Sequence, residues 1–158
     1  MSYLKNKLVA INRQPQAISK AWGGGNALLA NLCNAIAATG ATVTFDLNPN
    51  ADLAIIYDPR DAKEWLSLYK DSKTKIVARF GDLGTHGKPE MMGLVAQTAM
   101  VADRFIFPSQ WALGYFYSEY PFFSEINDVD IKKSSVISNT PDTLFFRRKP
   151  VKLVTHHW

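Results

Sequence analysis

The recurrence of short apolar runs along the chain constrains its fold more than any other feature. The runs are four to seven residues long, and a turn, a polar connector or a stretch with helical spacing separates each from the next. No two runs are joined by the two-residue turn of a β-hairpin. The pattern predicts strands at 7–12, 41–47, 53–57, 75–79, 104–107, 135–138 and 152–155. Helices are expected at 27–39, 61–69 and 89–102, and from Ser109 onward.

Strands that alternate with helices predict an α/β fold: a doubly wound, mostly parallel, Rossmann-like sheet with helices on both faces. The chain has 158 residues, which is enough for one such domain with a real core. Sheets of this kind bind ligands beyond the carboxyl ends of their strands. Two glycine-rich stretches, 23–25 and 80–87, follow strands, so we expect both at that edge.

The predicted helix at 27–39 is rich in alanine and leucine and carries apolar residues almost all round. We therefore expect it to be buried over most of its surface. Asn26 suits the N-cap position, and Gly40 suits the C′ position just after the helix.

Composition and charge limit which kinds of protein this can be and which kinds of partner it can bind. No stretch approaches the length of a membrane span, the N-terminus lacks the pattern of a signal peptide, and Cys33 is the only cysteine. These features favour a cytoplasmic protein without a membrane span. Residues 1–130 carry 12 Lys and Arg against 13 Asp and Glu, whereas residues 131–158 carry six against one. The net charge of +4 thus belongs to the C-terminal part, and we expect no nucleic-acid partner.

The three consecutive glycines at 23–25 precede the first predicted helix. They are not a P-loop, because Asn26 and Ala27 stand where that motif needs Lys and Ser or Thr. The dinucleotide fingerprint also fails, because Leu28 replaces its third glycine and ten residues separate the glycines from the strand. Two interpretations remain: a bend that needs positive φ, or a bare backbone cradle for an anion at a helix N-terminus.

Several segments, taken in order, resemble one family. They are a strand, a loop of about ten residues and Gly-Gly-Gly before an Ala/Leu helix, then ADRFIFPSQW (102–111), SVISNTPDTLFF (135–146) and KLVTHHW (152–158). This order is similar to that in the N-terminal lobe of a GT-B fold glycosyltransferase of the glycogen-synthase-like, family 4 type. The chain departs from the family at Thr140 and Pro141, where the family usually has Gly and Val or Ile.

The resemblance implies a hexosyltransferase-like enzyme that transfers a sugar from a nucleotide-diphosphate donor to a sugar or glycan acceptor. It implies an N-terminal lobe at 1–138, an interlobe connector at 139–151, and the first strand of a second lobe at 152–158. That second lobe would be the missing C-terminal partner, and the isolated lobe would be close to inactive. No metal or other cofactor is expected. The alternative is a non-catalytic, flavodoxin-like binding module for a small anion or a protein partner.

The resemblance also implies roles for individual residues. The donor-phosphate site would comprise Gly23, Gly24, Gly25 and Asn26. The catalytic residues would be Asp82 and His86, and the substrate-binding residues Arg79, Ser109 and Asn139.

Each role has a structural alternative. Arg79 could pair with Asp82 or Asp103, and Asp82 could instead cap its own loop. Ser109 suits a helix N-cap, and His86 could be an ordinary surface histidine.

Overall fold

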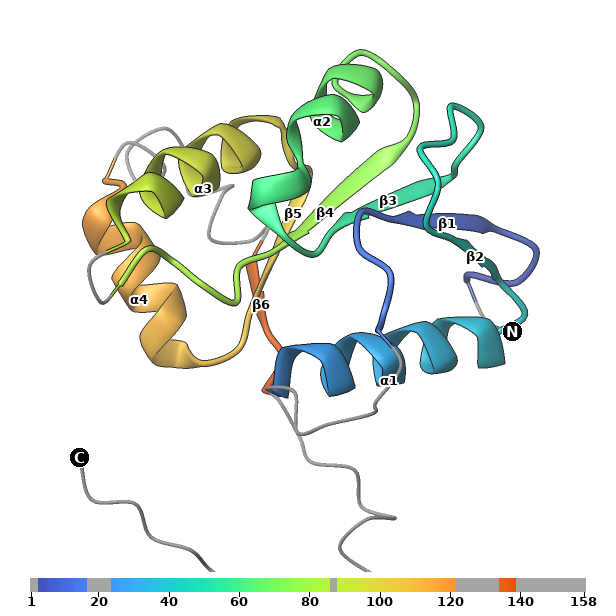
Figure 1. Cartoon of the computed structure of the whole chain (residues 1–158), viewed down its shortest axis with the longest axis horizontal. Coiled ribbons are helices and arrows are strands. Elements are labelled where there is room, and N and C mark those ends of the chain that lie inside the picture. The colour runs from blue at the N-terminus through green and yellow to red at the C-terminus, as the bar shows by residue number, and fades with distance from the viewer. Residues whose placement is uncertain (1–2, 17–23, 86–87, 122–133, 139–158) are drawn as a thin grey trace, which may run out of the picture.

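The structure, a computed structural model, describes residues 3–16, 24–85, 88–121 and 134–138. Within this part, six strands form one all-parallel sheet in the order β2-β1-β3-β4-β5-β6 (Figure 1). The strands are β1 (Leu8–Ile11), β2 (Thr42–Thr44), β3 (Leu53–Ile56), β4 (Lys75–Arg79), β5 (Arg104–Phe107) and β6 (Ser134–Val136). The predicted α/β fold class is therefore confirmed. The predicted connector at 139–151 and strand at 152–155 lie outside the described residues.

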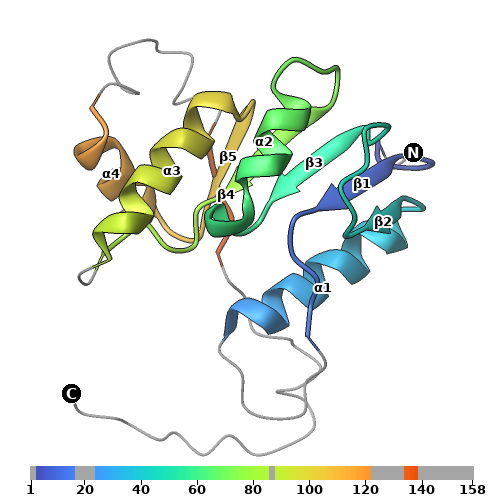
Figure 2. The same ribbon diagram turned by 45° about the horizontal axis from the view of Figure 1, so that its top comes forward.

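The helices lie on both faces of the sheet. They are α1 (Gly24–Ala38), α2 (Lys63–Tyr69), α3 (Pro89–Val101) and α4 (Gln110–Glu119), and a short 3-10 helix, η1 (Pro59–Asp61), precedes α2. Strand β2 is added next to one edge of β1, whereas β3, β4, β5 and β6 are added in turn on the opposite side of β1. Right-handed crossovers then put α1 on one face and the later helices on the opposite face (Figure 2).

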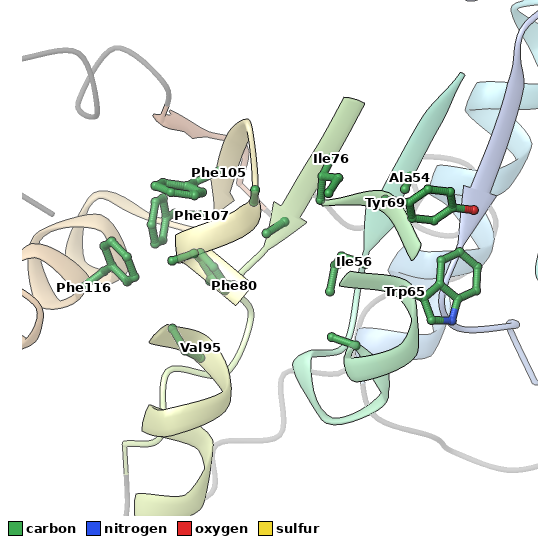
Figure 3. Packing of buried hydrophobic residues seen from close by; sticks show 14 of the residues in the cluster. Ala54, Ile56, Trp65, Tyr69, Ile76, Phe80, Val95, Phe105, Phe107 and Phe116 are labelled. Carbon is green, nitrogen blue, oxygen red and sulfur yellow. The ribbon is translucent and has the colours of Figure 1, made fainter. Parts of the chain in front are cut away.

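The sheet separates two apolar clusters. On the side of α1, Val9, Ile11 and Ile55 pack against α1 residues. The larger cluster, on the other side, centres on four phenylalanines that surround the end of β4 (Figure 3). They are Phe80, Phe105, Phe107 and Phe116, with ring centroids 5.2–6.5 Å apart. In β1 and β3, alternate residues face opposite clusters, as the pleat requires.

Helix α1 begins earlier than predicted. It begins at Gly24, so Asn26 lies in its first turn and is not the N-cap. The Asn26 amide is engaged instead with the backbone of Gln16, accepting from its N–H at 2.7 Å and donating to its carbonyl at 2.9 Å. Gly40 has a φ of 86°, as the predicted C′ position favours.

The burial expected for α1 over most of its surface is wrong. Only one stripe, which includes Leu29, Cys33 and Ile36, is buried, and the opposite stripe is exposed. The reason is that α1 packs on the sheet alone, without a second layer of described residues beyond it. Burial raises the pKa of the Cys33 thiol, which makes it less reactive at neutral pH. Among the described residues, no helix is both long and apolar enough to cross a membrane.

Candidate functional site

The sheet reverses its winding direction between β1 and β3, and a pocket opens beyond the carboxyl ends of these strands. Its volume is about 400 Å³. Crevices of this kind are where open α/β sheets bind ligands, because the two adjacent loops leave toward opposite faces. The polar residues lining the pocket come from the β1 loop, the first turn of α1 and the ends of β3 and β4: Arg13, Gln16, Asn26, Tyr57, Asp58, Arg60, Arg79 and Asp82.

Asn12 holds the strand ends together beneath the pocket. Its side-chain Nδ2 donates to the carbonyl of Asp58 at 2.7 Å. Its Oδ1 accepts from the backbone N–H of Tyr57 at 2.7 Å and from that of Asp58 at 3.2 Å. Asn12 is only 7% exposed, so these backbone groups depend on it and not on water. The amide thereby sets the spacing of the two loops that frame the crevice.

The Asp58 carboxylate joins two arginines from different loops. Arg13, after β1, pairs with Oδ2, and Arg60, in η1, donates through Nη2 to Oδ2 at 2.6 Å and through Nε to Oδ1 at 2.9 Å. Burial raises the pKa of Asp58, but the hydrogen bonds from Arg60 and the charges of both arginines outweigh it. The pKa therefore lies below its usual value. Asp58 is ionised at neutral pH and offsets much of the positive charge beside it.

We expect the free energy of unfolding to depend on pH through Asp58. Its pKa is lower in the folded than in the unfolded chain, so ionised Asp58 stabilises the fold above about pH 4, its unfolded pKa. This contribution is lost as the pH falls through the folded pKa. Asp58→Asn should therefore destabilise the protein by about 1–3 kcal/mol near pH 7, and by progressively less below pH 4.

Urea unfolding at a series of pH values measures this difference. Asp71→Asn is the matched control, because the Asp71 side chain is 87% exposed and meets Lys70 only at 3.9 Å. A gap between wild type and Asp58→Asn that stayed constant from pH 7 to pH 3 would contradict the prediction.

Arg79 lies against Tyr57 inside the pocket. Its Cζ atom is 4.8 Å from the centroid of the Tyr57 ring, within cation–π range. The Tyr57 hydroxyl donates to the carbonyl of Gly25 at 2.6 Å. Burial raises the pKa of Tyr57, opposed by the charges of Arg79 and Arg13. The ring thus links the end of β3, the first turn of α1 and the Arg79 guanidinium.

The structure brings some of the predicted site residues together and not others. Gly25, Asn26, Arg79 and Asp82 all line this pocket, and Gly24 is the first residue of α1. Ser109 is not among the pocket residues. The other predicted residues, Gly23, His86 and Asn139, lie outside the described part of the chain.

Ser109 and Asp82 also show the structural roles named as alternatives. Ser109 is the N-cap of α4 and accepts from the backbone N–H of Ala112 at 3.1 Å. Asp82 caps its loop by accepting from the N–H of Gly84 at 3.1 Å, and it pairs with Lys88 at 2.8 Å. Burial by itself would raise the pKa of Asp82. The hydrogen bonds from Lys88 and Gly84 have the larger, opposite effect, so the pKa lies below its usual value.

Sequence reasoning missed the residues at the end of β1 and β3 as members of the site. Asn12 and Arg13 follow the first buried strand, and Asp58 and Arg60 follow the third. The available signal was the rule already applied to the glycines: polar residues directly after buried parallel strands lie at the ligand-binding edge.

The described residues of this pocket can bind and stabilise an oxyanion. Their relevant groups are the first turn of α1, with its N–H groups, and the guanidinium groups of Arg13 and Arg79. Within the described ranges, no three His, Cys, Asp or Glu side chains cluster to form a potential metal site. Comparison of the chain with protein-family models, with curated proteins and with solved structures gave no match.

Proposed function

We propose that this chain is the N-terminal lobe of a nucleotide-sugar-dependent glycosyltransferase and that the pocket receives the donor diphosphate. The observation that carries the proposal is the convergence of α1's first turn with Arg13 and Arg79 at the point where the sheet reverses direction. The ordered sequence segments that resemble the GT-B family give the reaction class.

The pocket would act on the leaving diphosphate. The first N–H groups of a helix have no partner within the helix, and the helix dipole favours negative charge there. A glycine turn lets phosphate oxygens approach those N–H groups closely. With Arg13 and Arg79 beside it, negative charge that develops on the diphosphate as the glycosidic bond breaks would be stabilised.

Asp82 would face the acceptor side of the same pocket. Its lowered pKa makes it an ionised but weak proton acceptor, so orienting an acceptor hydroxyl suits it better than removing its proton. His86 remains the predicted partner in proton transfer. Catalysis would then rest mainly on placing donor and acceptor together.

The variant Gly25→Ala distinguishes the two interpretations of the glycine turn, an anion-binding cradle and a simple bend. A Cβ at Gly25 would meet no protein atom within 4 Å, and Gly25 lies inside α1 while lining the pocket. Alanine should therefore raise the free energy of unfolding by up to about 1 kcal/mol. If phosphate packs against this backbone, the added methyl group should weaken binding of UDP, GDP or ADP about tenfold or more, which is about 1.4 kcal/mol.

Calorimetric titration and thermal unfolding measure the two effects. Gly114→Ala in α4 is the control, since its Cβ would also meet no protein atom within 4 Å but lies outside the pocket. Equal nucleotide affinity in Gly25→Ala and wild type would reject the cradle. Transfer itself is tested with the full gene product by following the release of nucleoside diphosphate from nucleotide sugars and the attachment of the sugar to sugar or glycan acceptors. Absence of both binding and transfer would reject the enzyme.

A non-catalytic anion-binding module is the second candidate. The order β2-β1-β3-β4-β5 is also that of flavodoxin-like proteins, which bind phosphorylated ligands at the same switch point. Nucleotide binding without any sugar transfer by the full gene product would favour this candidate.

A further inference from the structure

We infer that Arg79 makes the pocket select a ligand with a compact oxyanion, a phosphate or a carboxylate group, and that Gly81 positions Arg79 for this. The inference deepens the proposed function and rests on it for the location of the ligand. Arg79 is then a specificity-determining residue and Gly81 a positioning residue, and neutral sugars are not the only ligands of this pocket.

Gly81 leaves the space in which the Arg79 side chain lies. A Cβ built on Gly81 would overlap Nη1 of Arg79 and would lie 3.1 Å from its Cζ and 3.3 Å from its Nη2. All three of these atoms belong to the guanidinium, the far end of a flexible side chain. An alanine at this position would therefore displace the guanidinium and leave the backbone in place.

Tyr57 provides the surface against which that guanidinium lies. Tyr57 is only 8% exposed, and its hydroxyl donates to the carbonyl of Gly25. A ring held at both ends is a rigid platform, so the guanidinium 4.8 Å from its centroid has a defined position. A cation–π contact uses the charge of a guanidinium and not its N–H donors, which lie in its plane and match the two oxygens of a carboxylate or phosphate.

The surroundings strengthen the attraction of Arg79 for an anion. The guanidinium is partly withdrawn from water, which reduces the screening of its charge by solvent. The buried carboxylate that lines the pocket, Asp58, is already held by Arg13 and Arg60. An incoming oxyanion at Arg79 therefore need not displace that ion-pair network.

The test compares Gly81→Ala with Gly93→Ala in the full chain. Gly93 lies in α3, and a Cβ there would meet no protein atom within 4 Å, so this variant controls for the glycine-to-alanine change alone. The probes are UDP, glucose 6-phosphate, glucuronate and neutral glucose, titrated by calorimetry, with the Arg79 Nε–H resonance followed by NMR. Arg79→Met is a second variant, which removes the guanidinium and keeps Gly81.

We expect glucose 6-phosphate or glucuronate to bind at least about tenfold more tightly than glucose and to shift the Arg79 resonance. Gly81→Ala and Arg79→Met should each remove most of that advantage, while Gly93→Ala should keep it, with all three variants folded by thermal unfolding. If UDP alone shows this dependence, the oxyanion is the donor's diphosphate. If the sugar acids show it, the oxyanion belongs to the second substrate.

The inference is overturned if glucose binds as well as its 6-phosphate and UDP binds equally to wild type and both variants. It is also overturned if none of the oxyanion probes binds the wild-type chain. Failure of the proposed function is a different result: sugar acids bind in a manner that depends on Gly81, but no nucleotide binds.

Discussion

Replacing Phe80 with alanine should lower the free energy of unfolding by about 3–5 kcal/mol. The side chain is fully buried, and its ring lies 5.7 Å from the rings of Phe105 and Phe107 and 5.4 Å from that of Phe116. Alanine would leave a cavity among three rings that are themselves fixed in β5 and α4, so the surroundings cannot close over it. Aromatic contacts beyond simple burial are lost as well.

Urea unfolding followed by circular dichroism measures this effect. Met100→Ala is the control, because Met100 is 72% exposed and should change the stability by no more than about 0.5 kcal/mol. A loss below 1 kcal/mol in Phe80→Ala would mean that the four phenylalanines do not form the packed centre described here. Phe80 lies between Arg79 and Gly81, so this packing also anchors the strand end that carries the pocket residues.

Asn12→Ala should cost about 2–4 kcal/mol of stability although it removes only one small polar side chain. The substitution leaves the N–H of Tyr57 and the carbonyl of Asp58 without their partner in a buried site. Each unsatisfied buried group costs about 1–3 kcal/mol. The loops at the ends of β1 and β3 should also separate, so ligand binding in the pocket should weaken along with stability.

Asn34→Ala is the matched control, because Asn34 is exposed on α1 and alanine favours helix, so stability should stay equal or rise slightly. Asn12→Asp is the informative second variant. A carboxylate can accept from both backbone N–H groups but cannot donate to the Asp58 carbonyl, and it adds a charge beside Asp58. It should therefore also destabilise the fold, and stability equal to wild type in either Asn12 variant would show that the amide does not hold the strand ends.

The positions of strands and helices followed from local patterns. Runs such as LAII and KIVAR became β3 and β4, because buried parallel strands need little more than continuous apolar residues. The extent of burial of α1 could not be predicted from local sequence patterns. It depends on whether a second layer covers the helix, and the helix's own sequence carries no information about that.

The candidate site, like the fold, was predictable from the sequence only in part. Glycines and polar residues after strands predicted which edge of the sheet binds ligands, because parallel strands all end at one edge. The sequence alone determined that Gly25, Arg79 and Asp82 lie at that edge. Only the tertiary structure decided that Asn12 bonds to the end of β3, that Asp58 is shared by two arginines, and that Arg79 lies over Tyr57 in the space left by Gly81. The physical reason is that Asn12 and Arg13 meet the end of β3, and Arg79 meets Tyr57, across tens of sequence positions. Strand order and side-chain packing, which no local pattern encodes, bring these residues together.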